Sequence, residues 1–257
     1  MKVVVEHMQT ANIPALHVYR EELAQRRLPF VIFIHGFTNA KEDNLHIAYL
    51  LAEKGFRVVL PDAIYHGERD ENLSEMELAV RFWQIVLNVI KELEWLKNDF
   101  AGKGLIDENK IGVFGTSMGG IATLGALTQY PWIQAAASLM GSPNFQEFFQ
   151  YLIDTYRQEG HNVPVTEEEI EEQFKALYDF DLSQHKEALN NRPLFFWHGM
   201  KDQVVPFQPT YRFYEEIKPL YAKNPENLKF FVEEQAGHKV SRKGVLLAVN
   251  WFVKHLK

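Results

Sequence analysis

The sequence predicts an α/β fold in which a mostly parallel central sheet carries helices on both faces. Short apolar runs alternate with helical patterns from residue 30 onward, which is typical of parallel strands joined by crossover helices. The run Phe30–Ile34 is continuously apolar, as expected of a strand that is buried on both faces. Polar motifs also follow the predicted strands, where such sheets gather their chemistry. These motifs are His35-Gly36, His66-Gly67, Gly115–Gly119, His198-Gly199 and Gly237-His238.

The length and composition indicate an ordinary globular chain. Its 257 residues are 46% hydrophobic and 24% charged, so residues 1–257 can fold as one domain around a large core. The net charge of −7 argues against nucleic acid as a partner. No apolar stretch approaches the roughly 20 residues of a membrane span, and the first residues lack the apolar segment of a secretory signal. The absence of cysteine fits a cytoplasmic location and excludes a thiol nucleophile.

Each strand of the predicted sheet follows from an apolar or β-branched run. Residues 2–6 and 13–19 form an antiparallel edge hairpin whose turn lies at residues 9–12. The run at residues 30–34 is the first buried strand. Further strands are expected at residues 56–60, 111–114, 135–140, 193–197 and 228–232.

The predicted helices lie between these strands. Residues 41–54 form a helix that ends at Gly55. Ser74 opens one long helix through a capping box with Glu77, and an apolar stripe at three- and four-residue steps continues to Leu96 and docks that helix on the sheet. Further helices are expected at residues 121–127, 208–217 and 244–256.

Residues 144–190 interrupt the alternation of strands and helices. This segment holds clustered aromatic side chains, followed by the acidic run Glu167–Glu172. The pattern predicts two or three helices inserted between two late strands as a cap above the carboxyl ends of the strands. The acidic run is interpreted as a solvated helix face.

The segment Gly115-Thr116-Ser117-Met118-Gly119 has the form of a nucleophile elbow, a tight turn from a strand into a helix. A five-residue G-x-S-x-G pattern arises by chance in about one chain in fifteen of this length. Here it follows an apolar strand and precedes an Ala/Leu-rich helix. That context indicates that Ser117 is a nucleophile exposed at the edge of the sheet.

A serine nucleophile needs an imidazole base and a carboxylate that orients the base. His238 follows the last predicted strand, and Asp202 follows the strand at residues 193–197. The order Ser117, Asp202, His238 is the order expected when loops after later strands serve an elbow serine. Rival acids lie in the insertion, at Asp154, Asp179 and Asp181, and rival bases precede glycine at strand ends, at His35, His66 and His198.

The negatively charged oxygen formed during acyl transfer needs two hydrogen-bond donors. The backbone N–H of Met118, next to the nucleophile, is the expected first donor. The second is expected from the loop after the strand at residues 30–34, at the backbone N–H of Phe37.

These motifs together resemble the α/β-hydrolase superfamily, on its dienelactone-hydrolase and prolyl-oligopeptidase side, and most closely the small bacterial carboxylesterases of the YitV/YjfP type. The similar segments span residues 30–240. The resemblance implies the α/β-hydrolase fold and hydrolysis of small carboxylic esters through an acyl-enzyme, without a metal or organic cofactor. Ser117 distinguishes the chain from dienelactone hydrolases, whose elbow carries cysteine.

A small-molecule ester is therefore the expected substrate. Apolar side chains near Ser117 are expected to form a compact pocket that favours short acyl groups; they are Phe37, Tyr65, Met118, Met140 and Phe145. Whether the aromatic residues of the insertion line this pocket or form the insertion's own core stays open. The sequence gives no indication of an oligomeric state.

Three alternatives remain beside the esterase prediction. A peptidase or amidase would use the same triad, and so would a thioesterase. A non-catalytic binding protein would keep the fold and a pocket, but binding alone requires none of the three triad residues.

Overall fold

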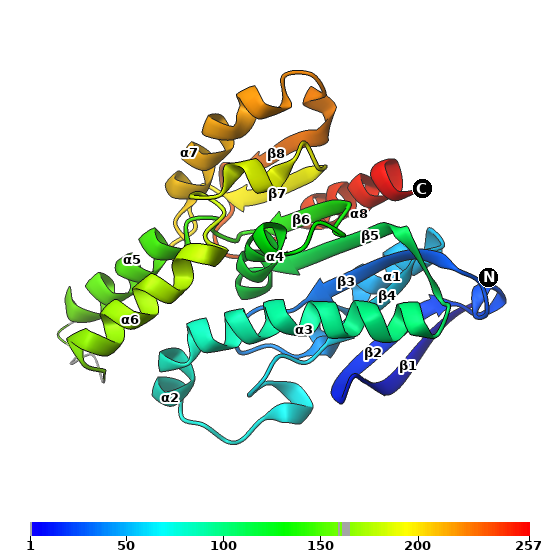
Figure 1. Cartoon of the computed structure of the whole chain (residues 1–257), viewed down its shortest axis with the longest axis horizontal. Coiled ribbons are helices and arrows are strands. Elements are labelled where there is room, and N and C mark those ends of the chain that lie inside the picture. Colours follow the sequence, from blue (N-terminus) through cyan, green and yellow to red (C-terminus); the bar gives the residue numbers. More distant parts are fainter. Residues whose placement is uncertain (1, 159, 161–164) are drawn as a thin grey trace.

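The computed structural model describes residues 2–158, 160 and 165–257, and they form one eight-stranded sheet (Figure 1). The strand order is β1-β2-β4-β3-β5-β6-β7-β8, in which β1 and β2 are antiparallel and β4 to β8 are parallel with β3. The predicted fold class is confirmed. The strands are β1 Val3–Thr10, β2 Ile13–Arg20, β3 Leu28–Ile34, β4 Arg57–Pro61, β5 Ile106–Thr116, β6 Ala135–Leu139, β7 Leu194–Gly199 and β8 Leu228–Glu233.

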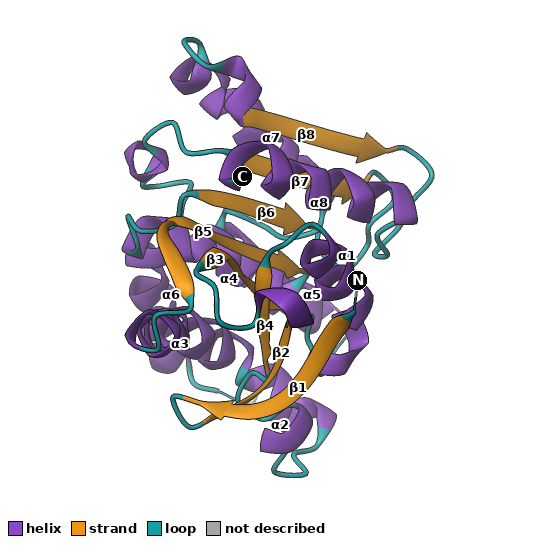
Figure 2. Ribbon diagram, turned by 90° about the vertical axis from the view of Figure 1, so that its right-hand side faces the viewer, coloured by secondary structure: helices purple, strands orange, loops and turns teal. Residues whose placement is uncertain are grey.

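Helices cover both faces of this sheet and form two hydrophobic cores. Figure 2 shows α1 and α8 on one face and α3 and α4 on the other. Strand β3 supplies both cores by alternation, since Phe30 and Ile32 pack toward α3 and α4 while Val31 and Phe33 pack toward α1 and α8. The helices are α1 Leu45–Glu53, α2 Glu75–Val80, α3 Phe82–Gly102, α4 Met118–Gln129, α5 Phe145–Gln158, α6 Glu167–Leu177, α7 Phe207–Ile217 and α8 Arg242–Leu256.

The N-terminal edge is the predicted hairpin, with longer strands than the sequence suggested. Its register runs from Val3 opposite Arg20 to Thr10 opposite Ile13. Ala11 and Asn12 form the turn with φ of 52° and 64°. A two-residue turn with both φ values positive matches the twist of a hairpin, and asparagine tolerates this conformation well.

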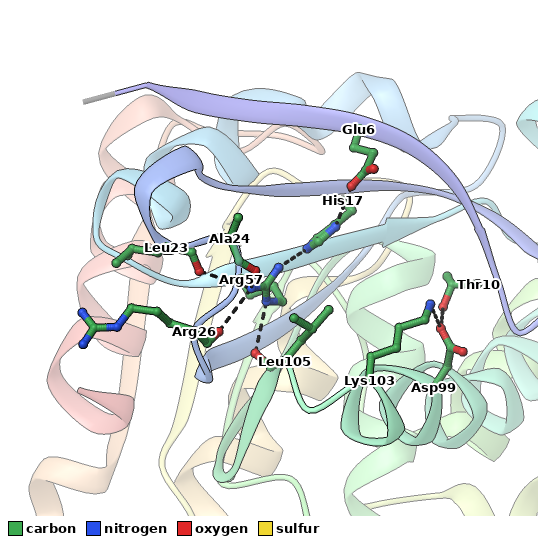
Figure 3. A network of polar contacts seen from close by, with 10 residues as sticks. All are labelled: Glu6, Thr10, His17, Leu23, Ala24, Arg26, Arg57, Asp99, Lys103 and Leu105. Carbon is green, nitrogen blue, oxygen red and sulfur yellow. Dashed lines mark hydrogen bonds and ion pairs between the residues drawn. The ribbon is translucent and has the colours of Figure 1, made fainter.

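A buried arginine ties this hairpin to the parallel strands (Figure 3). Arg57, at the start of β4, is fully buried. Its guanidinium donates to the carbonyl oxygens of Ala24, Arg26 and Leu105 at 2.7, 3.2 and 3.2 Å. It also donates to Nε2 of His17 on β2 at 2.7 Å. A buried charge needs such a full set of partners.

The prediction of one long helix from Ser74 is wrong, because the chain forms two helices that meet at Arg81. The capping box of Ser74 and Glu77 is present at the start of α2. Arg81 leaves the helical conformation with φ −86° and ψ 1°, and its N–H bonds the carbonyl oxygen of Leu78. Its side chain donates to the carbonyl oxygen of Glu77 at 2.8 Å, which satisfies an acceptor at the helix end.

The predicted helix at residues 41–54 is also shorter in the structure. Its first turn, Lys41–Asn44, is a 3₁₀ helix, and α1 begins only at Leu45.

The insertion contributes two helices, as predicted, and Figure 1 shows α5 and α6 extending beyond the edge at which the parallel strands end. Residues 159 and 161–164 of the predicted cap lie outside the described residues. Helix α6 begins with a capping box between Thr166 and Glu169. Within the described ranges, no helix has both the length and the apolar character that crossing a membrane requires.

Candidate active site

The turn between β5 and α4 places Ser117 at the carboxyl edge of the sheet. A Cβ on Gly115 would lie 2.1 Å from the carbonyl oxygen of Gly119, and a Cβ on Gly119 would lie 2.1 Å from that of Ile34. Only glycine fits at either position. Ser117 itself has φ 52° and ψ −117°, a strained conformation that costs about 1–3 kcal/mol and is held by the surrounding structure. The glycine spacing therefore reflects the close packing of this turn against β3.

Ser117, His238 and Asp202 form a continuous chain of hydrogen bonds. The Oγ of Ser117 lies 2.7 Å from Nε2 of His238, and Nδ1 of His238 lies 2.7 Å from Oδ2 of Asp202. The carboxylate accepts from Nδ1–H, so Nε2 is left with a lone pair that faces the hydroxyl. The structure thus brings together three residues that are 36 or more positions apart in the chain.

Several donors stabilise the charge of Asp202, whose side chain is fully buried. The backbone N–H groups of Val204 and Val205 donate to Oδ1 at 2.9 and 3.0 Å. Burial by itself would raise the pKa of Asp202, but hydrogen bonds from His198 and His238 outweigh burial and hold that pKa well below its usual range. Asp202 is therefore a carboxylate that holds the imidazole of His238 in one orientation.

His198, at the end of β7, is a further residue of this site. The sequence indicated only that His198 precedes a glycine at a strand end, as one of the rival bases. Its buried ring places Nε2 2.9 Å from the carbonyl oxygen of Val205 and 3.2 Å from Oδ2 of Asp202. Both neighbours are acceptors, so Nε2 carries the proton and donates to both. The only signal in the sequence was its place at a strand end, four residues before Asp202.

The loop after β3 brings the backbone of Phe37 close to the elbow. His66 holds this loop, because its Nδ1–H donates to the carbonyl oxygen of Ile64 at 2.8 Å and its Nε2 accepts the N–H of Thr38 at 3.0 Å. Burial lowers the pKa of His66 and so favours this neutral form. In the described part of the chain, the backbone N–H groups of Phe37 and Met118 bond no acceptor.

A largely apolar cavity of about 290 Å³ opens on Ser117. Its walls come from α2, α3, α4, α5, α6, the segment just before α6 and the loops that carry Phe37 and Val205. The lining residues are Phe37, Met76, Ala79, Val80, Phe82, Trp83, Ser117, Ile121, Phe148, Phe149, Leu152, Ile153, Tyr156, Val165, Gln173, Val204 and Val205.

Four of the five side chains predicted to line a pocket do not line this cavity. Met118 is buried in the core on the α3 and α4 face. Phe145 is fully buried beneath it, where its ring lies 5.1 Å from that of Trp83. Met140 packs with the core on the α1 and α8 face. Tyr65 has φ 62° and lies under the guanidinium of Arg81. Phe37 does line the cavity. Phe148 and Phe149, one turn after Phe145 on α5, line the wall at which Phe145 was expected.

One group of side chains within the described residues has the spacing of a metal site. His7, Glu42 and Glu68 place possible ligand atoms within 4.8 Å of one another at the surface. However, Nζ of Lys41 bonds Glu42 at 3.0 Å and Glu68 at 2.7 Å. Both carboxylates of this group are therefore already paired with the ammonium group of Lys41.

The α/β sheet and the elbow serine define a serine hydrolase with the α/β-hydrolase fold. A sequence profile of the prolyl oligopeptidase family matches residues 43–257, and the chain belongs to this family.

Two curated relatives cover almost all of the chain. YitV of Bacillus subtilis (strain 168), a candidate esterase, is 54% identical over 99% of this chain and 100% of its own length. Esterase YjfP of Escherichia coli (strain K12) is 30% identical over the same shares. Among solved structures, TT1662 from Thermus thermophilus superposes with a TM-score of 0.76 at 22% identity, covering 100% of this chain and 99% of its own.

Proposed function

We propose that this protein is a carboxylesterase that hydrolyses small carboxylic esters through an acyl-enzyme, with Ser117 as nucleophile, His238 as general base and acid, and Asp202 as the orienting carboxylate. The observation that carries the proposal is the pair of 2.7 Å contacts that join the three side chains. This geometry is what deprotonation of a serine hydroxyl requires.

The reaction follows from this geometry. Oγ of Ser117 attacks the ester carbonyl carbon while Nε2 of His238 takes the hydroxyl proton. The tetrahedral oxyanion accepts hydrogen bonds from the backbone N–H groups of Phe37 and Met118. As the carbon–oxygen bond breaks, His238 returns the proton to the leaving alcohol. Water then attacks the acyl-enzyme with the same proton transfers, releasing the acid and Ser117.

Further support for an ester as the substrate comes from the two relatives, which are named as an esterase and a candidate esterase. We also propose that residues 1–257 form one domain and that α5 and α6 act as its cap. The short-acyl prediction relied on Phe37, Tyr65, Met118, Met140 and Phe145, of which Phe37 alone lines the cavity. The preferred acyl length is instead inferred from the residues that do line it.

The test compares ester and amide hydrolysis in matched variants. We expect turnover of p-nitrophenyl esters, and Ser117→Ala should lower kcat by about 10⁵-fold. Thr116→Ser, beside the nucleophile, is the control for local disturbance. Turnover of p-nitroanilides without turnover of esters would favour a peptidase or amidase. Ester turnover that survives in folded Ser117→Ala would contradict the proposed nucleophile.

A further inference from the structure

We infer that the cavity between α2 and α5 is the site of the substrate's acyl chain, and that it selects an unbranched aliphatic chain of about six to ten carbons. This inference rests on the proposed function and adds the class of ester. It depends on four features of the cavity: its lining, its position relative to His238, its volume and its far end.

The lining of the cavity matches a hydrocarbon chain. Among the described residues that line it, no side chain carries a charge, and the polar groups are those of Ser117, Tyr156 and Gln173 and the indole N–H of Trp83. A sugar or an extended peptide would leave hydroxyl or amide groups without partners against such walls, at about 1–3 kcal/mol for each group. Methylene groups gain free energy on leaving water and have no such groups to satisfy.

The position of His238 distinguishes the acyl side of the substrate from the alcohol side. The leaving alcohol must lie next to Nε2 of His238, which protonates it. His238 is not among the lining residues, whereas Ser117 and Ile121, one turn further along α4, are. The alcohol therefore leaves outside the cavity, and the acyl chain bonded to Ser117 extends into it.

The volume of the cavity limits the length of the chain. If each methylene-sized group needs roughly 30 Å³, the share of one water molecule in the liquid, then 290 Å³ holds about ten groups. An acetyl group would leave most of the cavity unfilled, and a hexadecanoyl chain would exceed it.

The far end of the cavity is bridged by two side chains. Tyr156 lies seven residues after Phe149 on α5, about 10 Å further along that helix at 1.5 Å per residue. Its hydroxyl donates to Sδ of Met76 on α2 at 2.9 Å. Both residues line the cavity, so this contact between the insertion and the main domain limits the chain that starts at Ser117.

The experiment measures kcat/KM for p-nitrophenyl esters from acetyl to hexadecanoyl below their micelle concentrations. Burial of each methylene should raise kcat/KM by about three- to fourfold, so octanoyl should exceed acetyl by at least a hundredfold, and kcat/KM should fall beyond decanoyl. A maximum at acetyl, or a rise that continues to hexadecanoyl, would overturn the inference while leaving the esterase proposal intact. Absence of hydrolysis of every ester would instead overturn the proposed function.

Two blocking variants test the same inference at the cavity wall. Ile153→Trp fills the cavity from α5 and should lower kcat/KM for octanoyl at least tenfold while changing that for acetyl by less than twofold. Ala79→Trp does the same from α2. Asp154→Trp introduces the same indole at an exposed position of α5 outside the lining and should change neither value.

An equal loss on both esters in the two folded blocking variants would contradict an acyl site. A second series keeps the acetyl group and lengthens the alcohol from methyl to octyl. If kcat/KM depends on chain length in the alcohol series but not in the acyl series, the cavity binds the alcohol and the inference is overturned.

Discussion

Two histidines of this protein have the same kind of carboxylate partner but different third partners. Nδ1 of His17 lies 3.2 Å from Oε2 of Glu6, and Nδ1 of His238 lies 2.7 Å from Oδ2 of Asp202. The neighbour of Nε2 differs, since His17 faces the guanidinium of Arg57 and His238 faces the hydroxyl of Ser117 (Figure 3 shows the first of these arrangements).

The difference shows that a carboxylate–imidazole pair does not by itself make a base. Arg57 remains charged at any ordinary pH and donates permanently to the lone pair of His17. Burial, aided by Arg57, lowers the pKa of His17 to about 3. The side chain of His17 is 6% exposed, whereas that of His238 is 21% exposed beside a hydroxyl that can give up its proton. We therefore propose that the third partner decides between a structural and a chemical role.

Loss of each imidazole should affect a different property. His238→Ala should lower kcat by about 10⁴-fold or more with little change in the free energy of unfolding. His17→Ala should leave kcat within about twofold, measured per folded molecule, and lower the free energy of unfolding. Ester kinetics and urea unfolding of both variants check this. An equal loss of kcat in folded His17→Ala would remove the distinction.

The arginine that makes His17 structural should be essential to stability. Arg57→Met would leave His17 and the carbonyl oxygens of Ala24 and Arg26 without this buried donor, so the free energy of unfolding should fall by about 3–5 kcal/mol. Arg212→Met, which breaks an exposed pair with Glu147, should cost less than about 1 kcal/mol. Urea unfolding measures both values. Similar small losses would mean that the buried network contributes little.

Acid should weaken the fold through His17. Because the folded pKa of about 3 lies below the ordinary value of 6.5, the unfolded chain binds this proton first as pH falls. The stabilisation is complete above pH 6.5 and decreases toward pH 3, by about 3 kcal/mol between pH 6.5 and pH 4. Urea unfolding at several pH values should show that the free energy of unfolding of His17→Gln falls less steeply with acid than that of the wild-type protein, because the contribution of His17 is absent. Parallel pH profiles of the two proteins would contradict this assignment.

The smallest expected effect belongs to His198, which donates to Asp202 at 3.2 Å. His198→Phe should lower kcat about tenfold with KM unchanged, because Asp202 loses one of its donors. His198→Gln, which keeps an N–H donor, should recover most of that loss. His255→Phe in α8 is the matched control. A loss in His198→Gln as large as in His198→Phe would assign His198 to packing alone.

The positions of Ser117, Asp202 and His238 could be predicted because the carboxyl ends of parallel strands meet at one edge. Contacts within that edge could not. Whether His198 turns toward Asp202 and His66 toward Thr38 depends on the course of loops that carry no periodic pattern. The burial of Arg57 was equally hidden, because a single charge at the start of a strand usually faces water.

The pocket was the weakest part of the prediction, for a physical reason. Closeness to the site in sequence does not give the direction of a side chain, and one turn of α5 separates buried Phe145 from Phe148 and Phe149 at the cavity wall. The break at Arg81 was missed because the apolar stripe continues across it. That break separates α2, which supplies one wall of the cavity, from α3.

The most direct test of the central claim, that Ser117 is a nucleophile activated by His238, is covalent labelling with a fluorophosphonate followed by intact and peptide mass measurement. Wild-type protein and His17→Gln should each gain one phosphonyl group on Ser117. His238→Ala should react at least a thousandfold more slowly, and Ser117→Ala should gain none. Labelling of Ser117→Ala at the wild-type rate, or of wild-type protein at another residue, would contradict the account.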